Sequence, residues 1–95
     1  MASVEIYTRQ HCTYCHWAKE LLSRKGVAFH EFDVTGNSEM RQEMIERAGG
    51  ETFPQIFIGT THVGGCDELY ALEEAGKLDA LLGPTGGKPG EGQTA

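Results

Sequence analysis

Two cysteines separated by two residues lie where one pattern in the sequence ends and another begins. Before them, Val4 and Ile6 alternate with Glu5 and Tyr7, as expected for a half-buried β-strand. After them the pattern becomes helical, and the residues that share its inward face are Cys15, Ala18, Leu21 and Leu22. The chain thus passes from a strand through the cysteine pair into a helix, an order that indicates an α/β fold.

The rest of the chain continues this alternation of strands and helices. A second strand is expected over 31–34, and Asn37 or Ser38 caps a helix that ends at Gly49-Gly50. After Pro54, the expected elements are a β-hairpin with strands at 55–58 and 62–63, a helix over 66–75 and a last helical turn over 77–82. The order βαβ-α-ββα predicts a four-stranded mixed sheet flanked by helices, with a right-handed parallel crossover first and an antiparallel hairpin later.

The size of the chain allows one small domain. Of its 95 residues, the last thirteen, 83–95, contain five of the thirteen glycines, two of the three prolines and no large apolar side chain. Such a segment cannot bury enough surface to offset the entropy lost on ordering. We therefore predict a single domain over residues 1–82 and a disordered Gly/Pro-rich tail over residues 83–95.

Charge and cysteine content limit the partners and the location. The formal charge is −6, which disfavours binding to nucleic acid or to an anionic membrane. The first 25 residues nevertheless carry four basic and two acidic side chains, so the end with the cysteine pair suits a small acidic ligand. There is no apolar run of about 18 residues and no export signal, and three cysteines are too few for a secreted disulfide scaffold. We expect a cytoplasmic protein with no membrane partner.

The segment His11-Cys12-Thr13-Tyr14-Cys15-His16 is compatible with more than one chemistry. Its C-x-x-C-H spacing attaches haem in exported proteins, but no export signal is present. A structural zinc site needs four ligands, and only Cys66, His30 and His62 remain, scattered along the chain. Two cysteines merely packed at a helix start are a further alternative. Because C-x-x-C beside a βαβ pattern is typical of redox centres, we favour a dithiol centre and expect no metal ligands.

In a dithiol centre the two sulfurs have different tasks. A sulfur at a helix start faces unpaired backbone N–H groups and the positive end of the helix dipole, which favour the reactive thiolate. Cys12 is therefore the expected nucleophile, with Arg9 as a nearby cation. Cys15 lies one turn further and nearer the core, so it is less ionised but within reach of a disulfide with Cys12. The helical aromatic Trp17 is expected to be a packing residue.

Four stretches of the sequence carry a recognisable set of motifs. They are Tyr7-Thr8-Arg9, Cys12-Thr13-Tyr14-Cys15, Thr52-Phe53-Pro54-Gln55-Ile56-Phe57-Ile58 and Gly64-Gly65-Cys66-Asp67-Glu68-Leu69. Together they resemble the glutaredoxin family, with most likeness to the bacterial glutaredoxin three subgroup, from about Val4 to Leu82. The resemblance implies a thioredoxin-like fold. It also implies a glutathione-dependent thiol–disulfide oxidoreductase that reduces protein–glutathione mixed disulfides and protein disulfides.

The same resemblance implies a glutathione site. Its residues would be Arg9, Tyr14, Arg41, Thr52, Phe53, Pro54, Gly65, Cys66 and Asp67. A cis-Pro54 would present the backbone of Phe53 to the cysteine part of glutathione as a short antiparallel strand. Gly65 would permit close approach of the loop, and the amides of Cys66 and Asp67 at a helix start would bind the γ-glutamyl carboxylate.

The remaining proposed contacts involve side chains. Arg9 and Arg41 would pair with the glycyl carboxylate, although Arg41 is also explained as an ordinary solvated charge. The Asp67 carboxylate would meet the γ-glutamyl ammonium group, and Tyr14 would border the sulfur groove. Cys66 is expected to be structural, because only its backbone N–H is required.

Two positions depart from the family pattern. Thr13 stands where the common dithiol motif has proline, and Phe53 replaces the more usual valine. Because glutaredoxins without that proline in some cases hold a [2Fe–2S] cluster between two protomers, a cluster carrier is the alternative function. Its ligands would be Cys12 from each protomer and two glutathione thiolates. We expect a monomer, with a dimer only when a cluster is bound.

Overall fold

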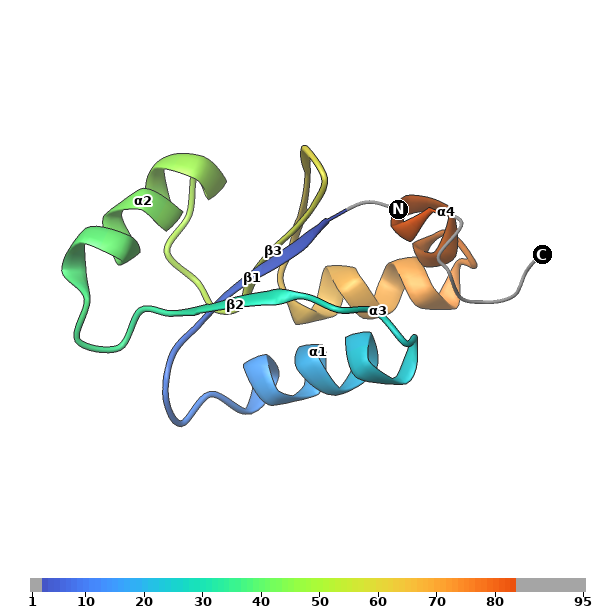
Figure 1. Ribbon diagram of the computed structural model, residues 1–95, viewed down its shortest axis with the longest axis horizontal. Helices are drawn as coiled ribbons and strands as arrows, with labels where there is room; N and C mark the ends of the chain where they lie inside the picture. The colour runs from blue at the N-terminus through green and yellow to red at the C-terminus, as the bar shows by residue number, and fades with distance from the viewer. Residues whose placement is uncertain (1–2, 84–95) are drawn as a thin grey trace.

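The computed structural model describes residues 3–83, so the predicted tail beyond Gly83 lies outside the described residues. The elements follow the predicted order and end in a short helix (Figure 1). They are β1 (Val4–Thr8), α1 (Thr13–Arg24), β2 (His30–Asp33), α2 (Ser38–Ala48), β3 (Gln55–Ile58), β4 (Thr61–Gly64), α3 (Cys66–Glu74) and α4 (Leu78–Leu82). Across residues 3–83, no helix combines the length and the apolar character needed to cross a membrane.

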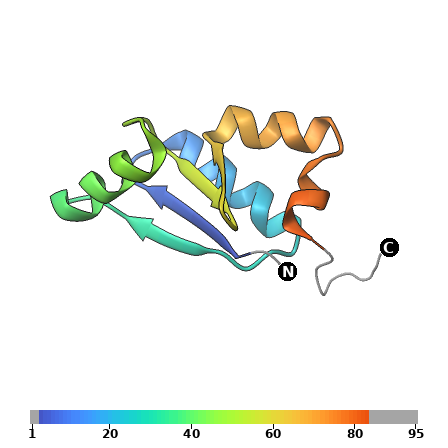
Figure 2. The same cartoon turned by 90° about the horizontal axis from the view of Figure 1, so that it is seen from above.

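The four strands form one mixed sheet in the order β2-β1-β3-β4, which can be followed in Figure 2. β1 pairs in parallel with β2 and antiparallel with β3, where Ile6 lies opposite Ile56. β3 and β4 form the antiparallel hairpin, with an irregularity in register between Ile56 and Phe57. The prediction of a parallel crossover followed by an antiparallel hairpin is confirmed.

Helices cover both faces of this sheet. α1 and α3 lie on one face, and α2 lies on the other, as Figure 1 shows. The larger core cluster joins the first face of the sheet to α1, α3 and α4, with Ile6, Leu22, Ile56, Leu69 and Leu78 all completely buried. A smaller cluster under α2 contains Tyr7, Val34, Met44 and Phe57. The fold is therefore a three-layer α/β arrangement.

The covering of both faces corrects one prediction. β1 was expected to be half-buried, but Tyr7 is only 2% exposed and belongs to the core under α2. Its ring lies 5.1 Å from that of Phe32 and 6.1 Å from that of Phe57, measured between centroids. The alternation of residue types predicts one solvent-exposed face, but the Tyr7 ring fills the second core layer instead.

The ends of α2 have the expected local causes. Asn37 is the N-cap, and its side-chain oxygen accepts a hydrogen bond of 3.0 Å from the Met40 N–H. Gly49 ends the helix in the left-handed conformation, with φ of 73°. Of the two capping residues considered, the structure thus selects Asn37.

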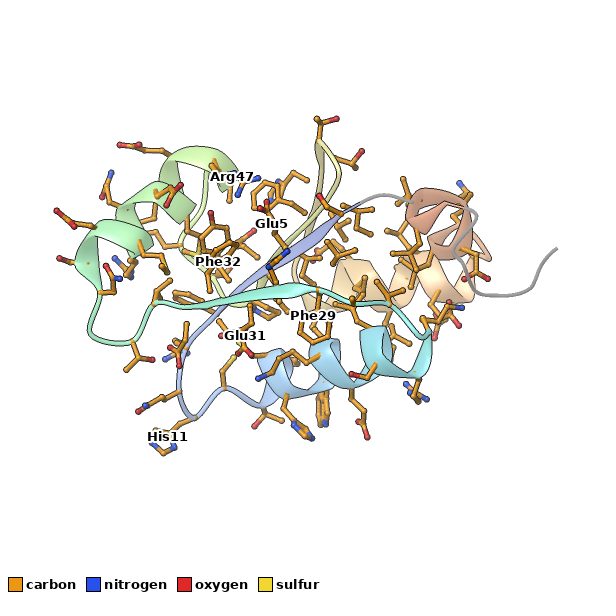
Figure 3. The ribbon with its side chains drawn as sticks, in the orientation of Figure 1. Glu5, His11, Phe29, Glu31, Phe32 and Arg47 are labelled. Atoms are coloured by element: carbon orange, nitrogen blue, oxygen red, sulfur yellow. The ribbon has the colours of Figure 1, made fainter. Side chains whose placement is uncertain are left out.

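Arg47 fastens the end of α2 to the sheet. Its guanidinium forms an ion pair of 3.0 Å with Glu5 and donates a hydrogen bond of 2.9 Å to the Tyr7 hydroxyl. It also lies 4.1 Å from the centroid of the Phe57 ring. Figure 3 shows Arg47 and Glu5 reaching toward each other from α2 and β1. These contacts fix the helix that precedes the loop carrying Pro54.

Candidate active site

The cysteine pair lies at the start of α1, on the side of the sheet that this helix covers. Cys12 is the N-cap, with extended backbone angles, and its sulfur accepts a hydrogen bond of 3.2 Å from the Cys15 N–H. The turn before it contains His11 at φ of 58°, a left-handed conformation that is uncommon for a residue other than glycine. The sulfur of Cys12 therefore receives an N–H group at the positive end of a helix of 12 residues.

The three cysteines differ in accessibility. Cys12 is partly exposed, whereas Cys15 is 2% and Cys66 5% exposed. Burial first, and then the hydrogen bond with Cys12, raises the pKa of Cys15 to about 12. Burial, followed by the charge of Asp67, also raises the pKa of Cys66. Cys15 and Cys66 are thus held as thiols at neutral pH, and solvent reaches Cys12.

The loop before β3 lies next to the start of α3. The Phe53–Pro54 peptide bond is cis, as the resemblance implied, and Pro54 is buried. A Cβ atom at Gly65 would lie 3.4 Å from the carbonyl oxygen of Pro54, so the two segments approach closely. The Gly65 N–H donates a hydrogen bond of 2.8 Å to Glu68, while the amides of Cys66 and Asp67 lie in the first turn, where no intrahelical carbonyl is available.

The basic and aromatic residues proposed for the site lie in different surroundings. The Arg9 guanidinium stacks over the Phe53 ring, 5.5 Å from its centroid, which places it beside the Pro54 loop. Arg41 forms an exposed ion pair of 3.1 Å with Glu51. Tyr14 is 53% exposed and meets the Trp17 ring edge-on, with centroids 5.6 Å apart.

The position of Trp17 corrects a second prediction. The residue was expected to pack, but it is 46% exposed. Its helix buries Cys15, Ala18, Leu21 and Leu22 instead. Because Trp17 directly precedes the buried Ala18 but lies off that inward face, its ring remains on the surface beside Tyr14.

The buried side chain of Gln55 links the Pro54 loop to β4 through hydrogen bonds that the sequence does not predict. Gln55 is 4% exposed, and its side-chain nitrogen donates to the carbonyl and the hydroxyl of Thr52, at 3.0 and 2.9 Å. Its side-chain oxygen lies 2.7 Å from Nε2 of His62 on β4. Since the Gln55 nitrogen donates, its oxygen accepts and His62 Nε2 carries the proton. The one available signal was a glutamine at the head of the apolar run that follows Pro54.

These hydrogen bonds give a testable contribution to stability. Gln55→Leu should lower the free energy of unfolding by about 1–3 kcal/mol, because it removes the hydrogen bonds that the buried Gln55 side chain forms with Thr52 and His62. Urea unfolding measures the change. The matched control is Gln42→Leu at an exposed position of α2, where a loss within about 0.5 kcal/mol is expected. Equal stability of the two variants would contradict the role assigned to Gln55.

Among residues 3–83, the structure contains no group of three or more His, Cys, Asp or Glu side chains that could hold a metal ion. The candidate site consists of three segments: the start of α1 with the Cys12 sulfur, the cis-Pro54 loop and the first turn of α3. Arg9 reaches this loop, and Thr52 is bonded behind it.

Comparison with known proteins shows which family the chain belongs to. The family model described as glutaredoxin matches residues 4–63. Glutaredoxin 3 of Escherichia coli strain K12 is 60% identical over 82 residues, which is 86% of this chain and 99% of the relative. The solution structure of a glutaredoxin from Brucella melitensis has 62% identity and a TM-score of 0.77, covering 86% of this chain and 89% of that one.

A more distant structure is informative because of its ligand. The crystal structure of a buckwheat glutaredoxin–glutathione complex has 25% identity and a TM-score of 0.77, covering 85% of this chain and 76% of that one. The family model spans the cysteine pair, the Pro54 loop and most of β4. The chain belongs to the glutaredoxin family, with the thioredoxin-like fold and the thiol–disulfide oxidoreductase activity of that family.

Proposed function

We propose that the chain is a glutathione-dependent oxidoreductase in which Cys12 is the nucleophile and Cys15 the resolving thiol. The observation that carries the proposal is the contrast between the two sulfurs. Cys12 is solvent-accessible and accepts the Cys15 N–H at a helix start, while Cys15 is buried with its pKa raised to about 12 by burial and by its contact with Cys12. The Cys12 sulfur is therefore available to attack a substrate disulfide, and the Cys15 thiol reacts only in the later, resolving step.

The first step transfers glutathione from a protein to Cys12. The Cys12 thiolate attacks the glutathione sulfur of a protein–glutathione mixed disulfide. A new bond forms between Cys12 and glutathione, the old disulfide breaks, and the protein sulfur leaves as a thiolate that takes a proton from water. A second glutathione thiolate then attacks the bound glutathione sulfur, which releases glutathione disulfide and restores the Cys12 thiolate.

Protein disulfides use both cysteines. Cys12 attacks one substrate sulfur to form a mixed disulfide, and Cys15, after losing its proton, attacks the Cys12 sulfur. The Cys12–Cys15 disulfide forms, and the substrate leaves with both of its sulfurs reduced. Two glutathione molecules in turn reduce this disulfide. The buried position of Cys15 one helical turn behind Cys12 supports this division.

The proposed glutathione site follows the segments around Cys12. The Phe53 backbone beside cis-Pro54 would pair with the central residue of glutathione, and the open amides of Cys66 and Asp67 would bind one carboxylate. Gly65 keeps this turn close to the loop. The Asp67 side chain would meet the ammonium group of the same end.

The other carboxylate would lie at the opposite end of the site. Arg9 already lies beside Phe53 and can form an ion pair with this carboxylate. Arg41 would first have to break its ion pair with Glu51. Tyr14 would border the sulfur, and Thr52 would act through its bonds with Gln55. The reduced glutathione pool of the cytoplasm would supply the electrons.

Two coupled assays test the dependence on glutathione. Turnover is expected with glutathione, glutathione reductase and NADPH, and not with thioredoxin reductase and NADPH.

Arg9→Gln should raise the KM for glutathione roughly tenfold with kcat retained, the size expected for one charge-assisted hydrogen bond. Arg24→Gln, an exposed arginine at the far end of α1, is the control and should leave KM unchanged. Equal turnover with thioredoxin reductase, or no change of KM in Arg9→Gln, would contradict this account.

The second candidate is a carrier of a [2Fe–2S] cluster. It rests on Cys12 as an accessible sulfur followed by Thr13, where the common motif has proline. Among residues 3–83, a single chain offers no group of three side chains that could ligate a metal ion. A cluster would therefore need Cys12 from each of two protomers and two glutathione thiolates. Anaerobic reconstitution with iron, sulfide and glutathione, followed by visible absorption and size measurement, decides between them. A colourless monomer would exclude the carrier and leave the oxidoreductase monomeric.

A further inference from the structure

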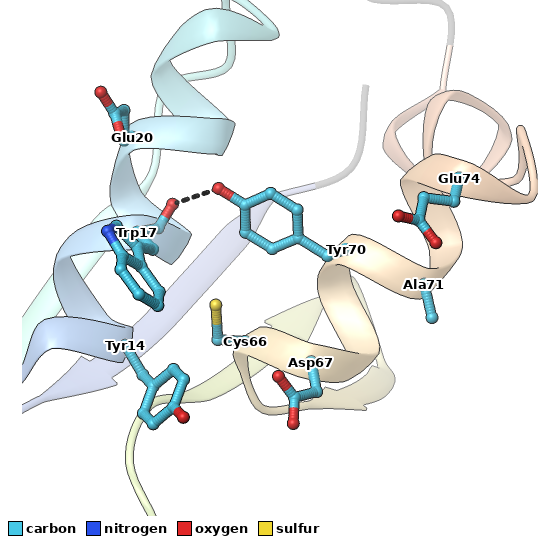
Figure 4. Close-up of a pocket in the computed structure, with 8 residues that line it drawn as sticks. All are labelled: Tyr14, Trp17, Glu20, Cys66, Asp67, Tyr70, Ala71 and Glu74. Carbon is cyan, nitrogen blue, oxygen red and sulfur yellow. Dashed lines mark hydrogen bonds between the residues drawn. The ribbon is translucent and has the colours of Figure 1, made fainter.

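A groove of about 490 Å³ runs between α1 and α3, and its lining includes Tyr14, which lies between the two cysteines in the sequence. Figure 4 shows its walls, with Tyr14, Trp17 and Glu20 from α1 on one side and Asp67, Tyr70 and Glu74 from α3 on the other. The thiol of Cys66 lies between these walls, in the first turn of α3. The groove thus begins at the part of α3 that approaches the Pro54 loop and continues away from it along both helices.

A hydrogen bond connects the two walls of the groove, and three of the side chains that line it are aromatic: Tyr14, Trp17 and Tyr70. The Tyr70 hydroxyl donates a hydrogen bond of 3.2 Å to the carbonyl oxygen of Trp17, which ties α3 to α1. Trp17 and Tyr14 contact each other edge-on and remain 46% and 53% exposed. Large aromatic rings that stay exposed beside a groove are typical of binding surfaces, because they offer apolar area at low entropic cost.

The charge of the groove has a single sign. Glu20, Asp67 and Glu74 are exposed, and no basic side chain lines the groove. Within the part of the chain that the structure describes, none of these three carboxylates forms an ion pair, whereas Lys19, Lys25, Arg41 and Arg47 all have acidic partners elsewhere. Carboxylates next to exposed aromatic faces attract a cation both by charge and by the negative face of each ring.

We propose that this groove docks a basic segment of the substrate protein, in which arginine or lysine side chains lie beside the disulfide or glutathionylated cysteine. The proposal rests on the proposed function for its substrate chemistry and adds the class of protein that the enzyme favours. The aromatic rings would hold the stems and planar head groups of the basic side chains, and Glu20 and Glu74 would pair with their charges. The start of α3 would leave the substrate sulfur near Cys12.

Binding can be measured without any redox chemistry. Trp17 is the only tryptophan of the chain, so intrinsic fluorescence reports directly on the groove. The probe is an eight-residue peptide with arginine and leucine alternating, without cysteine or aromatic residues, and its comparison replaces each arginine with glutamate. We expect a saturable fluorescence change with the basic peptide that weakens as salt is raised, and none with the acidic peptide.

A pair of double variants separates the groove from the overall charge. Glu20→Gln with Glu74→Gln should weaken the basic peptide roughly fivefold, as expected for the loss of two exposed charge contacts. Glu43→Gln with Glu46→Gln removes the same charge from exposed positions of α2, on the other face of the sheet, and should leave binding unchanged. An absent response to the basic peptide, or equal weakening in both double variants, overturns the docking proposal.

Turnover completes the test and keeps it distinct from the proposed function. For turnover, each of the two peptides is extended by one cysteine, which is glutathionylated. Wild type should show a higher kcat/KM for the basic substrate, and this kcat/KM should be roughly fivefold lower in the Glu20/Glu74 double variant. Turnover of a small neutral disulfide should be unchanged in that variant. A failure of glutathione turnover in wild type would contradict the proposed function alone, because the fluorescence titration does not depend on it. Equal kcat/KM for the two peptides in an active enzyme would overturn the docking proposal.

Discussion

Replacement of Cys12 by serine is expected to reduce turnover of glutathione mixed disulfides by at least about 10³-fold, the scale of losing a catalytic nucleophile. The reason is that Cys12 alone among the three cysteines is accessible to solvent and lies at the start of a helix, whereas Cys15 and Cys66 are buried thiols. The measurement is the glutathione-coupled rate with a glutathionylated peptide. The free energies of unfolding of wild type and Cys12→Ser should agree, since the sulfur of a partly exposed N-cap residue contributes little to packing.

Cys15→Ser and Cys66→Ser are the matched controls. Cys15→Ser should keep the glutathione mixed-disulfide reaction and lose most turnover of protein disulfides, because only the second route needs a resolving thiol. Cys66→Ser should keep both routes, provided that it folds. Retained turnover in Cys12→Ser would remove the assignment of the nucleophile. Loss of the mixed-disulfide reaction in Cys15→Ser would show that the dithiol route carries all turnover.

The largest effect on stability is expected from Leu69→Ala. Leu69 is completely buried in the larger core cluster, where α3 packs against α1 and the sheet. Truncation removes its apolar area and leaves a cavity, so the free energy of unfolding should fall by about 2–5 kcal/mol. Urea unfolding at constant pH measures this change. Because α3 also supplies the first turn beside the Pro54 loop, activity should fall with the folded fraction.

Leu81→Ala serves as the comparison for Leu69→Ala. Leu81 is only partly buried and packs at the edge of the same cluster, so its truncation removes less buried area. We expect a loss of less than about 1.5 kcal/mol, since its site is open to solvent and little cavity remains. If both variants lost the same free energy, Leu69 would not have the central packing role that its burial indicates.

Much of the fold could be predicted because local signals and packing agree. Asn37 caps and Gly49 ends the same helix for independent local reasons, and the inward face of α1 is the one that the spacing of Cys15 and Leu22 indicates. The burial of Tyr7 could not be predicted in this way. Alternation of residue types shows which side chains share a face, but it does not show whether a helix from elsewhere in the chain covers that face.

The site was predictable in its motifs and less so in its contacts. The start of α1 at the cysteine pair and the cis bond at Pro54 were anticipated. The pairing of Arg41 with Glu51 and the bond of His62 to Gln55 were not, because they join side chains that the loop and the hairpin bring together in space. The exposure of Trp17 follows from its position off the inward face of α1, which its residue type alone does not indicate.

The central claim is that Cys12 is the accessible, reactive sulfur of the folded protein, while the sulfurs of Cys15 and Cys66 are buried thiols. Alkylation with limiting iodoacetamide at pH 7, followed by peptide mass spectrometry over time, tests it most directly. The account predicts fast modification at Cys12 alone, with Cys15 and Cys66 modified only after unfolding. A Cys12 that reacts no faster than an ordinary peptide thiol, or a Cys15 that reacts first in the folded protein, would contradict it.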